Sequence, residues 1–128
     1  MAKVVSFSNQ KGGVGKTTSC VNLSAQIANK GKKVLMIDMD PQGNATSGLG
    51  ISKAKIDKTI YDVIIGKARI ADAIIKTRFK NLSVVPSNIN LAGAELELNE
   101  LEEFENYLKT ELETIKADYD YIFIDRAA

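Results

Sequence analysis

The feature that most restricts the fold of this sequence is a glycine-rich stretch, residues 11–18, between two apolar segments. It reads Lys-Gly-Gly-Val-Gly-Lys-Thr-Thr, and three glycines so close together are unfavourable inside a helix or strand, which predicts a loop. The preceding segment, Lys3–Phe7, is short and apolar, as in a central strand of a parallel sheet. After the loop, Cys20, Leu23 and Ile27 recur at helical spacing. Strand, glycine loop and helix in this order predict the start of a β-α-β unit.

The rest of the chain extends this pattern. Three more strands are expected, at residues 33–38, 82–86 and 119–125. Short helices are expected around residues 60–64 and 70–74, and a longer one over 95–117 whose apolar side chains form a single stripe. No linker or internal repeat divides the 128 residues. We therefore predict one α/β domain over residues 1–128, a parallel sheet flanked by helices.

The glycine-rich stretch has the chemistry of a phosphate-binding loop. The usual pattern is Gly-x-x-x-x-Gly-Lys-[Ser/Thr]; Gly15, Lys16 and Thr17 match its end, whereas Gln10 stands in place of its first glycine. Backbone N–H groups in such a turn converge on phosphate oxygens, and the helix N-terminus adds a partial positive charge. Lys16 would reach the β- and γ-phosphates, and the Thr17 hydroxyl would bind Mg²⁺.

The whole run forms the expected nucleotide-binding stretch: Lys11, Gly12, Gly13, Val14, Gly15, Lys16, Thr17 and Thr18. A glycine-rich turn with a solvated lysine is the alternative, which the position between strand and helix disfavours. Lys11 has two open interpretations. It is either a surface lysine or a charge offered to a nucleotide bound by another subunit, as an arginine finger would be.

Carboxylates follow two of the predicted strands. Because ligand groups gather at the carboxyl ends of parallel strands, Ser8 to Gln10, Asp38 to Asp40 and Asp125 are expected at one edge. Asp125 fits a Walker B carboxylate that orients Mg²⁺, and Asp40 fits a residue that positions the attacking water. Thr17, Asp40 and Asp125 are thus the candidate metal residues, and Lys11, Lys16 and Asp40 the candidate catalytic ones. Ordinary turn-forming or capping roles are the alternative for both aspartates, and Asp38 could cap a helix or hold a loop instead.

Composition excludes several other classes of protein. The sequence has no histidine, which removes Ser-His-Asp catalysis and most zinc sites. Its single cysteine forms no internal disulfide and fits a reducing cytoplasm. No apolar run approaches the ~20 residues of a membrane span. Residues 1–90 carry 14 Lys and Arg against 5 Asp and Glu, and residues 91–128 carry 3 against 11. The basic part could favour phosphates or nucleic acid, or both parts could be solvated surfaces of one fold.

Together these motifs resemble the ParA/Soj family of chromosome and plasmid partitioning ATPases, within the deviant-Walker-A superfamily that also contains MinD. The resemblance rests on residues 9–18, 34–50, 91–95 and 119–125. The stretch Asp-Pro-Gln-Gly-Asn at 40–44 favours ParA/Soj over MinD, and the lack of cysteine pairs disfavours the iron–sulfur branches. The acidic segment 95–117 is also the wrong charge for a MinD-like membrane helix.

The resemblance implies a P-loop fold that binds ATP and Mg²⁺ and forms an ATP-dependent homodimer or higher oligomer. In it, Lys11 would reach across the subunit interface, Gly12 would lie where the two loops approach, and Asp40 would support hydrolysis. The family's ATP-bound dimers bind DNA non-specifically, and a ParB-type centromere-binding partner stimulates hydrolysis. A cytoplasmic, nucleoid-associated protein without membrane contact is therefore expected.

The resemblance covers nearly the whole chain, but the family normally continues Cys-Pro-Pro after the Walker B aspartate, where this sequence reads Arg126-Ala127-Ala128. We therefore expect an N-terminal half, truncated after the Walker B strand. By resemblance, the other half carries much of the adenine pocket, of the dimer face and of the DNA-binding residues. A sheet without its later strands would keep an open edge, which predicts self-association. The alternative function is a non-catalytic fragment that binds nucleotide weakly or only self-associates.

Overall fold

A computed structural model describes the chain except for residues 1, 8–13, 41, 88–100 and 127–128. The side chains of residues 14–18, 53, 101–105 and 126 are also outside the described part. The statements below concern the rest.

The described chain forms a five-stranded sheet in the order β1-β5-β2-β4-β3. Its strands are β1 (Lys3–Phe7), β2 (Val34–Met39), β3 (Ile75–Lys76), β4 (Leu82–Val85) and β5 (Tyr121–Arg126). All neighbouring pairs are parallel except β3 with β4. The four predicted strands and the parallel α/β fold are confirmed. The sequence analysis missed β3, because two residues are too short for a pattern of alternating burial.

The short helices predicted around residues 60–64 and 70–74 are confirmed, whereas the helices nearer the start of the chain differ from the prediction. The helices are α1 (Val14–Asn29), α2 (Asn44–Gly48), α3 (Ile60–Ile64), α4 (Ile70–Ala73) and α6 (Leu101–Glu113), with 3₁₀ turns η1 (Lys53–Lys55) and η2 (Lys116–Asp118). The predicted loop over residues 11–18 is wrong in its second half, because α1 already begins at Val14. Gly15 therefore lies in the first helical turn. The short helix α2 was not predicted at all.

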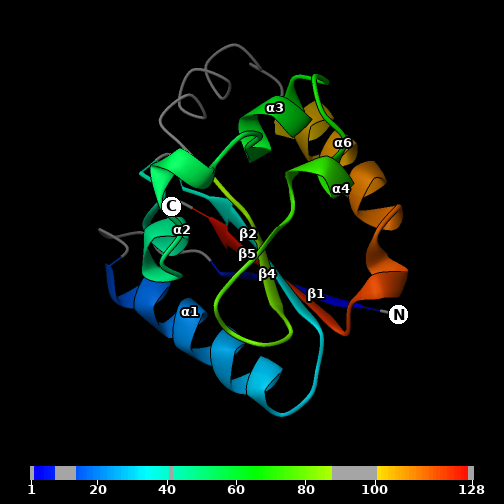
Figure 1. The fold of residues 1–128 in the computed structure, drawn as a ribbon. Coiled ribbons are helices and arrows are strands. Elements are labelled where there is room, and N and C mark those ends of the chain that lie inside the picture. The colour runs from blue at the N-terminus through cyan, green and yellow to red at the C-terminus, as the bar shows by residue number, and fades with distance from the viewer. Residues whose placement is uncertain (1, 8–13, 41, 88–100, 127–128) are drawn as a thin grey trace.

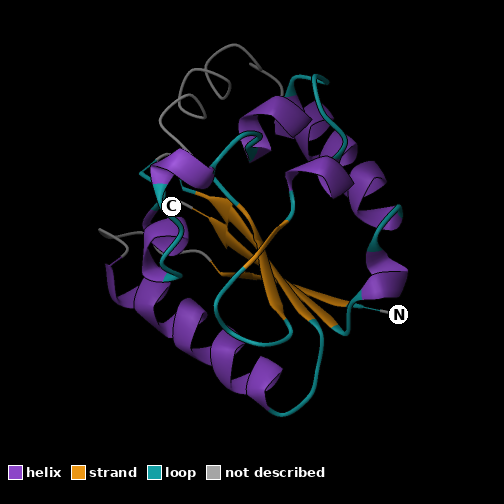
Figure 2. Ribbon diagram, viewed as in Figure 1, coloured by secondary structure: helices purple, strands orange, loops and turns teal. Residues whose placement is uncertain are grey.

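Helices cover both faces of the sheet (Figures 1 and 2). The side chains of Val34 and Met36 on β2 pack against α1 and α2, whereas Leu35 and Ile37 pack against α3, α4 and α6. Every residue of β2 is accordingly buried, as expected for a parallel strand covered on both sides. Within the described residues, no helix is both long enough and apolar enough to cross a bilayer.

Strand β1 is not central, contrary to the prediction. It pairs with β5 alone among the described strands and lies at the edge of the sheet. The segment Ile122–Ile124, apolar throughout and buried, occupies the place between β1 and β2. On β1 itself Val4 is 38% exposed. The described part of the sheet therefore has an open edge along β1, as expected from the sequence.

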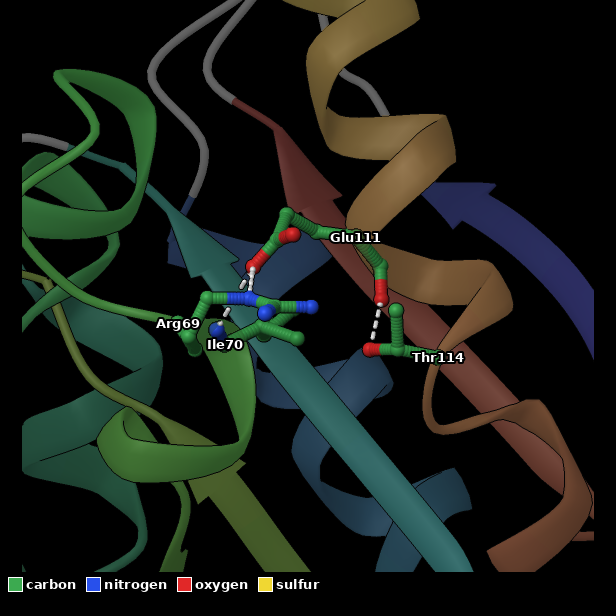
Figure 3. A network of polar contacts seen from close by, with 4 residues as sticks. All are labelled: Arg69, Ile70, Glu111 and Thr114. Carbon is green, nitrogen blue, oxygen red and sulfur yellow. Dashed lines mark hydrogen bonds and ion pairs between the residues drawn. The ribbon is translucent and has the colours of Figure 1, made fainter.

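A buried glutamate joins two of the helices on the second face. Glu111 of α6 accepts hydrogen bonds from the backbone N–H of Ile70, at 2.9 Å, and from Nε of Arg69, at 3.3 Å (Figure 3). The hydroxyl of Thr114 donates to the backbone carbonyl of Glu111 at 2.6 Å. Because Ile70 is the first residue of α4, Glu111 satisfies an amide that has no acceptor within its own helix.

Candidate functional site

The strand order brings Asp38 and Asp125 to one edge of the sheet. Phe7, at the end of β1, is level with Asp125 on β5, and Asp125 is level with Asp38 on β2. The carboxyl end of β1 therefore lies beside Asp125, one strand away from Asp38. The expectation that the strand ends converge is thus met for the described residues.

Helix α1 begins at Val14, within the glycine-rich stretch. The backbones of Val14, Gly15, Lys16, Thr17 and Thr18 form its first residues, and its first turn contains no acidic side chain. The first N–H groups of a helix have no acceptor within it and carry a partial positive charge. This end of α1 therefore has the backbone chemistry that phosphate oxygens require.

Several predicted site residues lie wholly or partly outside the described residues. The positions Lys11, Gly12 and Gly13 are not described, and neither are the side chains of Lys16 and Thr17. Their expected roles in binding phosphate and Mg²⁺ stay predictions.

Asp38 is a buried structural carboxylate. It accepts hydrogen bonds from the backbone N–H of Asp40 at 3.0 Å, and from the backbone N–H and hydroxyl of Thr46 at 2.8 and 2.6 Å. It therefore ties the turn after β2 to helix α2. Of the roles considered for Asp38, holding a loop and capping a helix are the ones that these contacts support.

Burial perturbs the titration of this carboxyl group. The pKa of Asp38 is raised from 3.8 to about 6, because removal from water and the neighbouring charge of Asp125 raise it by more than the hydrogen bonds from Thr46 and Asp40 lower it. Desolvation is the largest of these effects. Two buried carboxylates on adjacent strands thus give this edge a concentrated negative charge, beside the positive end of α1.

Asp40 lies at the rim of the same edge and is 9% exposed. Its Oδ1 accepts from the backbone N–H of Gln42 at 3.0 Å, and its Oδ2 accepts from Nδ2 of Asn44 at 2.8 Å. These contacts make Asp40 a turn-forming residue. A carboxylate has about four lone-pair positions, so the same group retains acceptor capacity for a water molecule or a cation.

Asp125 occupies the position expected of a carboxylate at the end of an apolar strand. It is fully buried and lies between the end of β1 and Asp38 in the sheet register. Of the three candidate metal residues, the structure brings Asp40 and Asp125 to one edge. Among the described residues, no three acidic, cysteine or histidine side chains form a cluster able to hold a metal ion.

Two further residues, Thr46 and Gly43, support this edge, and the contacts of both with Ser87 were not predicted. Thr46 is buried and donates to Asp38. Its hydroxyl also accepts from the backbone N–H of Ser87 at 3.2 Å, which joins α2 to the end of β4. Gly43, with a φ of +66°, lets α2 start next to Ser87, because a Cβ there would lie 3.3 Å from the Ser87 carbonyl oxygen. A polar residue eight positions after a buried aspartate is too weak a signal to predict this contact.

Comparisons with known proteins agree with the fold and the motifs. A family model described as "AAA domain" matches residues 2–127. The sporulation initiation inhibitor protein Soj of Bacillus subtilis is 53% identical over 125 residues, which cover 98% of this chain and 49% of that protein. The chromosome partitioning protein ParA of Caulobacter vibrioides is 44% identical, over 96% of this chain and 47% of that protein.

A solved structure is also similar to the chain. It is the cobyrinic acid a,c-diamide synthase of Mycobacterium smegmatis with a bound ATP analogue and magnesium, which superposes with a TM-score of 0.91 at 35% identity. The match covers 99% of this chain and 52% of that one. The chain thus spans about half the length of the curated relatives and of the solved structure that it matches.

Proposed function

Because the chain belongs to the AAA-domain family and to its ParA/Soj-type partitioning ATPases, we propose that it is the nucleotide-binding half of such an ATPase. The observation that supports the proposal is that the carboxyl end of β1 and the aspartates of β2 and β5 lie at one edge of the sheet, with α1 as the next described element after β1. This edge presents backbone donors for phosphate next to carboxylates suited to Mg²⁺.

Each predicted site residue has a proposed role in phosphoryl transfer. The amides of residues 12–17 and the ammonium of Lys16 hold the phosphates. Thr17, Asp40 and Asp125 would hold Mg²⁺, and the bound ion would supply positive charge against that of the phosphate oxygens. Asp40 positions the attacking water, and Lys11 reaches the nucleotide of a second subunit. A similar solved structure with a bound ATP analogue and magnesium supports this choice of cofactors.

The remaining functions concern the whole protein, of which this chain matches about half. We propose that the complete molecule forms a homodimer or higher oligomer when it binds Mg·ATP. It then binds DNA non-specifically, and a ParB-type partner stimulates its hydrolysis of ATP. A chromosomal or plasmid partition role in the cytoplasm, at the nucleoid, follows from these properties.

The test is the affinity of the chain for Mg·ATP, measured by isothermal titration calorimetry for the parent chain and for Lys16→Ala. Loss of a charged contact of about 1.5–3 kcal/mol weakens binding by roughly 10- to 150-fold. The matched control is Lys55→Ala, which removes an exposed lysine of η1 and should leave the affinity unchanged. Equal affinity of the parent chain and Lys16→Ala would contradict the proposal.

The open edge of β1 favours the alternative of a fragment that mainly self-associates. Val4 is exposed on this edge, and it lines a groove of about 300 Å³ together with Leu108, Leu112 and Ile124. Analytical ultracentrifugation with and without Mg·ATP separates the two functions. The same degree of association with and without nucleotide, together with no release of phosphate, would support the alternative of a non-catalytic fragment. A chain that is monomeric in the absence of nucleotide would contradict it.

A further inference from the structure

The stretch Asp-Pro-Gln-Gly-Asn at 40–44 contains a side-chain amide that has no role in the proposed function, that of Asn44. Its Nδ2 donates to Oδ2 of Asp40 at 2.8 Å, four residues earlier in the chain. Asn44 is the first residue of α2 and is exposed, whereas Asp40 is buried. The contact therefore joins a side chain at the surface to the carboxylate that is proposed to position the attacking water.

The two oxygens of the Asp40 carboxylate have separate donors. Oδ1 accepts from the backbone N–H of Gln42 at 3.0 Å, and Oδ2 accepts from Asn44. A carboxylate with a donor on one oxygen can still turn about its Cβ–Cγ bond, because this torsion is soft. A second donor on the other oxygen fixes the plane of the group. About two of its four lone-pair positions then stay open, and Asn44 helps to set their directions.

Asn44 is itself held in place by the helix that it begins. The backbone N–H and the hydroxyl of Thr46 donate to Asp38 at 2.8 and 2.6 Å, which fixes α2 to the end of β2. Ala45 and Leu49 are buried in the same apolar cluster as residues of α1. The first residue of α2 therefore has a defined position, and a donor that orients another side chain requires such a rigid support.

The turn after β2 also has contacts that do not involve the Asn44 side chain. The backbone N–H of Gly43 donates to the carbonyl of Asp40 at 2.8 Å, and the backbone N–H of Asp40 donates to Asp38 at 3.0 Å. With the Gln42 contact, these bonds define the path of the main chain. The amide of Asn44 thus acts on the carboxylate rather than on the backbone.

The chemistry of an amide suits this task. A lysine or arginine at position 44 would also donate to Asp40, but its charge would offset the negative charge that attracts a water proton. A neutral amide orients the carboxylate and leaves its charge in place.

We propose that Asn44 is a positioning residue for ATP hydrolysis, which turns the Asp40 carboxylate so that an open lone pair accepts a proton of the attacking water in a hydrogen bond. In that reaction the water oxygen forms a bond to the γ-phosphorus, and the bond from this phosphorus to the bridging oxygen breaks, with its electron pair left on ADP. One water proton stays on the phosphate product and the other passes to solvent. The inference rests on the proposed function of Asp40.

The test is the rate of phosphate release at saturating Mg·ATP for the parent chain, Asn44→Ala, Asp40→Ala and the double variant. A misplacement of about 1 Å can cost roughly 100-fold in rate, so we expect Asn44→Ala to be about 10- to 100-fold slower, with an affinity for Mg·ATP close to the parental one. Asp40→Ala should lose at least as much. In the Asp40→Ala background, removal of Asn44 should have no further effect, because the carboxylate that it orients is absent.

Three further variants control for the fold and for the chemistry of the donor. Ser47→Ala removes an exposed polar side chain from the same helix and should keep the parental rate. Asn44→Gln keeps an amide donor and should recover part of the lost rate. Asn44→Asp has nearly the same shape but replaces the donor by a second acceptor, so it should be at least as slow as Asn44→Ala.

The contact can also be measured without nucleotide. The side-chain amide protons of Asn44, observed in ¹H–¹⁵N NMR spectra, should exchange with solvent more slowly in the parent chain than in Asp40→Ala, because Asp40 accepts one of them. Equal exchange in the two chains would overturn the inference.

Calorimetry of Mg·ATP binding separates this inference from the proposed function. If the parent chain binds Mg·ATP, the inference is overturned by an absence of hydrolysis, by equal rates in the parent chain and Asn44→Ala, or by a faster Asn44→Ala. It is also overturned if removal of Asn44 costs as much in the Asp40→Ala background as in the parent chain. In each of these cases nucleotide binding stands. A parent chain that binds no Mg·ATP overturns the proposed function, and the inference falls with it.

Discussion

The hydroxyl of Thr46 should hold the turn at the candidate site in place, and Thr46→Val tests this. Valine has nearly the same shape as threonine but cannot donate to Asp38 or accept from Ser87, as the threonine hydroxyl does at 2.6 and 3.2 Å. The backbone N–H of residue 46 keeps its bond to Asp38 in the variant. The substitution therefore removes two hydrogen bonds and little packing.

The expected loss of stability follows from these two contacts. A hydrogen bond to a buried carboxylate contributes about 1.5–3 kcal/mol, and a buried amide left without an acceptor costs about 1–3 kcal/mol. Since the two effects share one hydroxyl and are not fully additive, we expect the free energy of unfolding to fall by about 2–5 kcal/mol near neutral pH. Domains of this size are stable by only about 5–15 kcal/mol.

The pH dependence gives the prediction its specific signature. The pKa of Asp38 is about 6 in the folded chain, against 3.8 ordinarily, so between these values the folded state holds more protons than the unfolded state. The free energy of unfolding therefore falls as pH rises from about 4 to 6, by about 3 kcal/mol from this group. Loss of the Thr46 hydrogen bond, which lowers this pKa, raises the pKa further. The effect of Thr46→Val is thus larger at pH 7.5 than at pH 4.5.

Urea unfolding followed by circular dichroism at these two pH values measures the effect. Thr46→Ser is the matched control, because it keeps the hydroxyl and loses one methyl group, so it should cost only about 1 kcal/mol at either pH. Other titrating groups cancel when each variant is compared with the parent at the same pH. A Thr46→Val effect that is equal at the two pH values, or no larger than that of Thr46→Ser, would refute the reasoning.

Two further pairs of substitutions test the packing of the helices. Glu111→Ala should lower the free energy of unfolding by about 1–3 kcal/mol, because it leaves the first amide of α4 buried without its acceptor, whereas Arg69→Ala, with a side chain 65% exposed, should cost less than about 1 kcal/mol. Equal effects in thermal unfolding would mean that the ion pair, not the amide contact, matters. Gly43→Ala should destabilise by about 1–2 kcal/mol, since φ is +66° and the new Cβ would lie 3.3 Å from the Ser87 carbonyl oxygen. Gly48→Ala should instead stabilise by up to about 1 kcal/mol, since its Cβ would meet only a side-chain methyl group at 3.4 Å within a helix; effects of the same sign would contradict this.

The sequence predicted those parts of the fold that are encoded locally. The strand before the glycine-rich stretch, the apolar run ending at Asp125 and the helical stripes each carry their own signal over five or more residues. The position of a strand within the sheet has no such signal. Lys3–Phe7 has the composition of an inner strand, but in the structure it lies at the edge of the sheet. The inner position next to it belongs to β5, whose residues 122–125 are buried.

Helix α1 shows the same limit at the level of single side chains. The helical spacing of Cys20, Leu23 and Ile27 predicted that Leu23 lies on the apolar face of this helix. In the structure Leu23 is 39% exposed and Ser24 is fully buried. The hydroxyl of Ser24 donates to the carbonyl of Cys20 at 2.7 Å, which satisfies it inside the core. A small polar residue that bonds to its own helix can therefore occupy a buried position, and hydrophobicity alone does not reveal it.

The buried carboxylate of Asp38 connects the stability of the fold to the geometry of the candidate site. An apolar side chain at position 38 would avoid the cost of removing a carboxylate from water, which is the effect that raises the pKa of Asp38. It would also leave the Asp40 amide and both donors of Thr46 without their acceptor. Because Asp38 binds the amide of Asp40 itself, it fixes the point from which the Asp40 side chain departs. Burying the Asp38 carboxylate lowers the stability of the fold, but the carboxylate positions Asp40, the residue proposed to position water. A functional constraint of this kind, rather than core packing, explains a charged residue at a buried position.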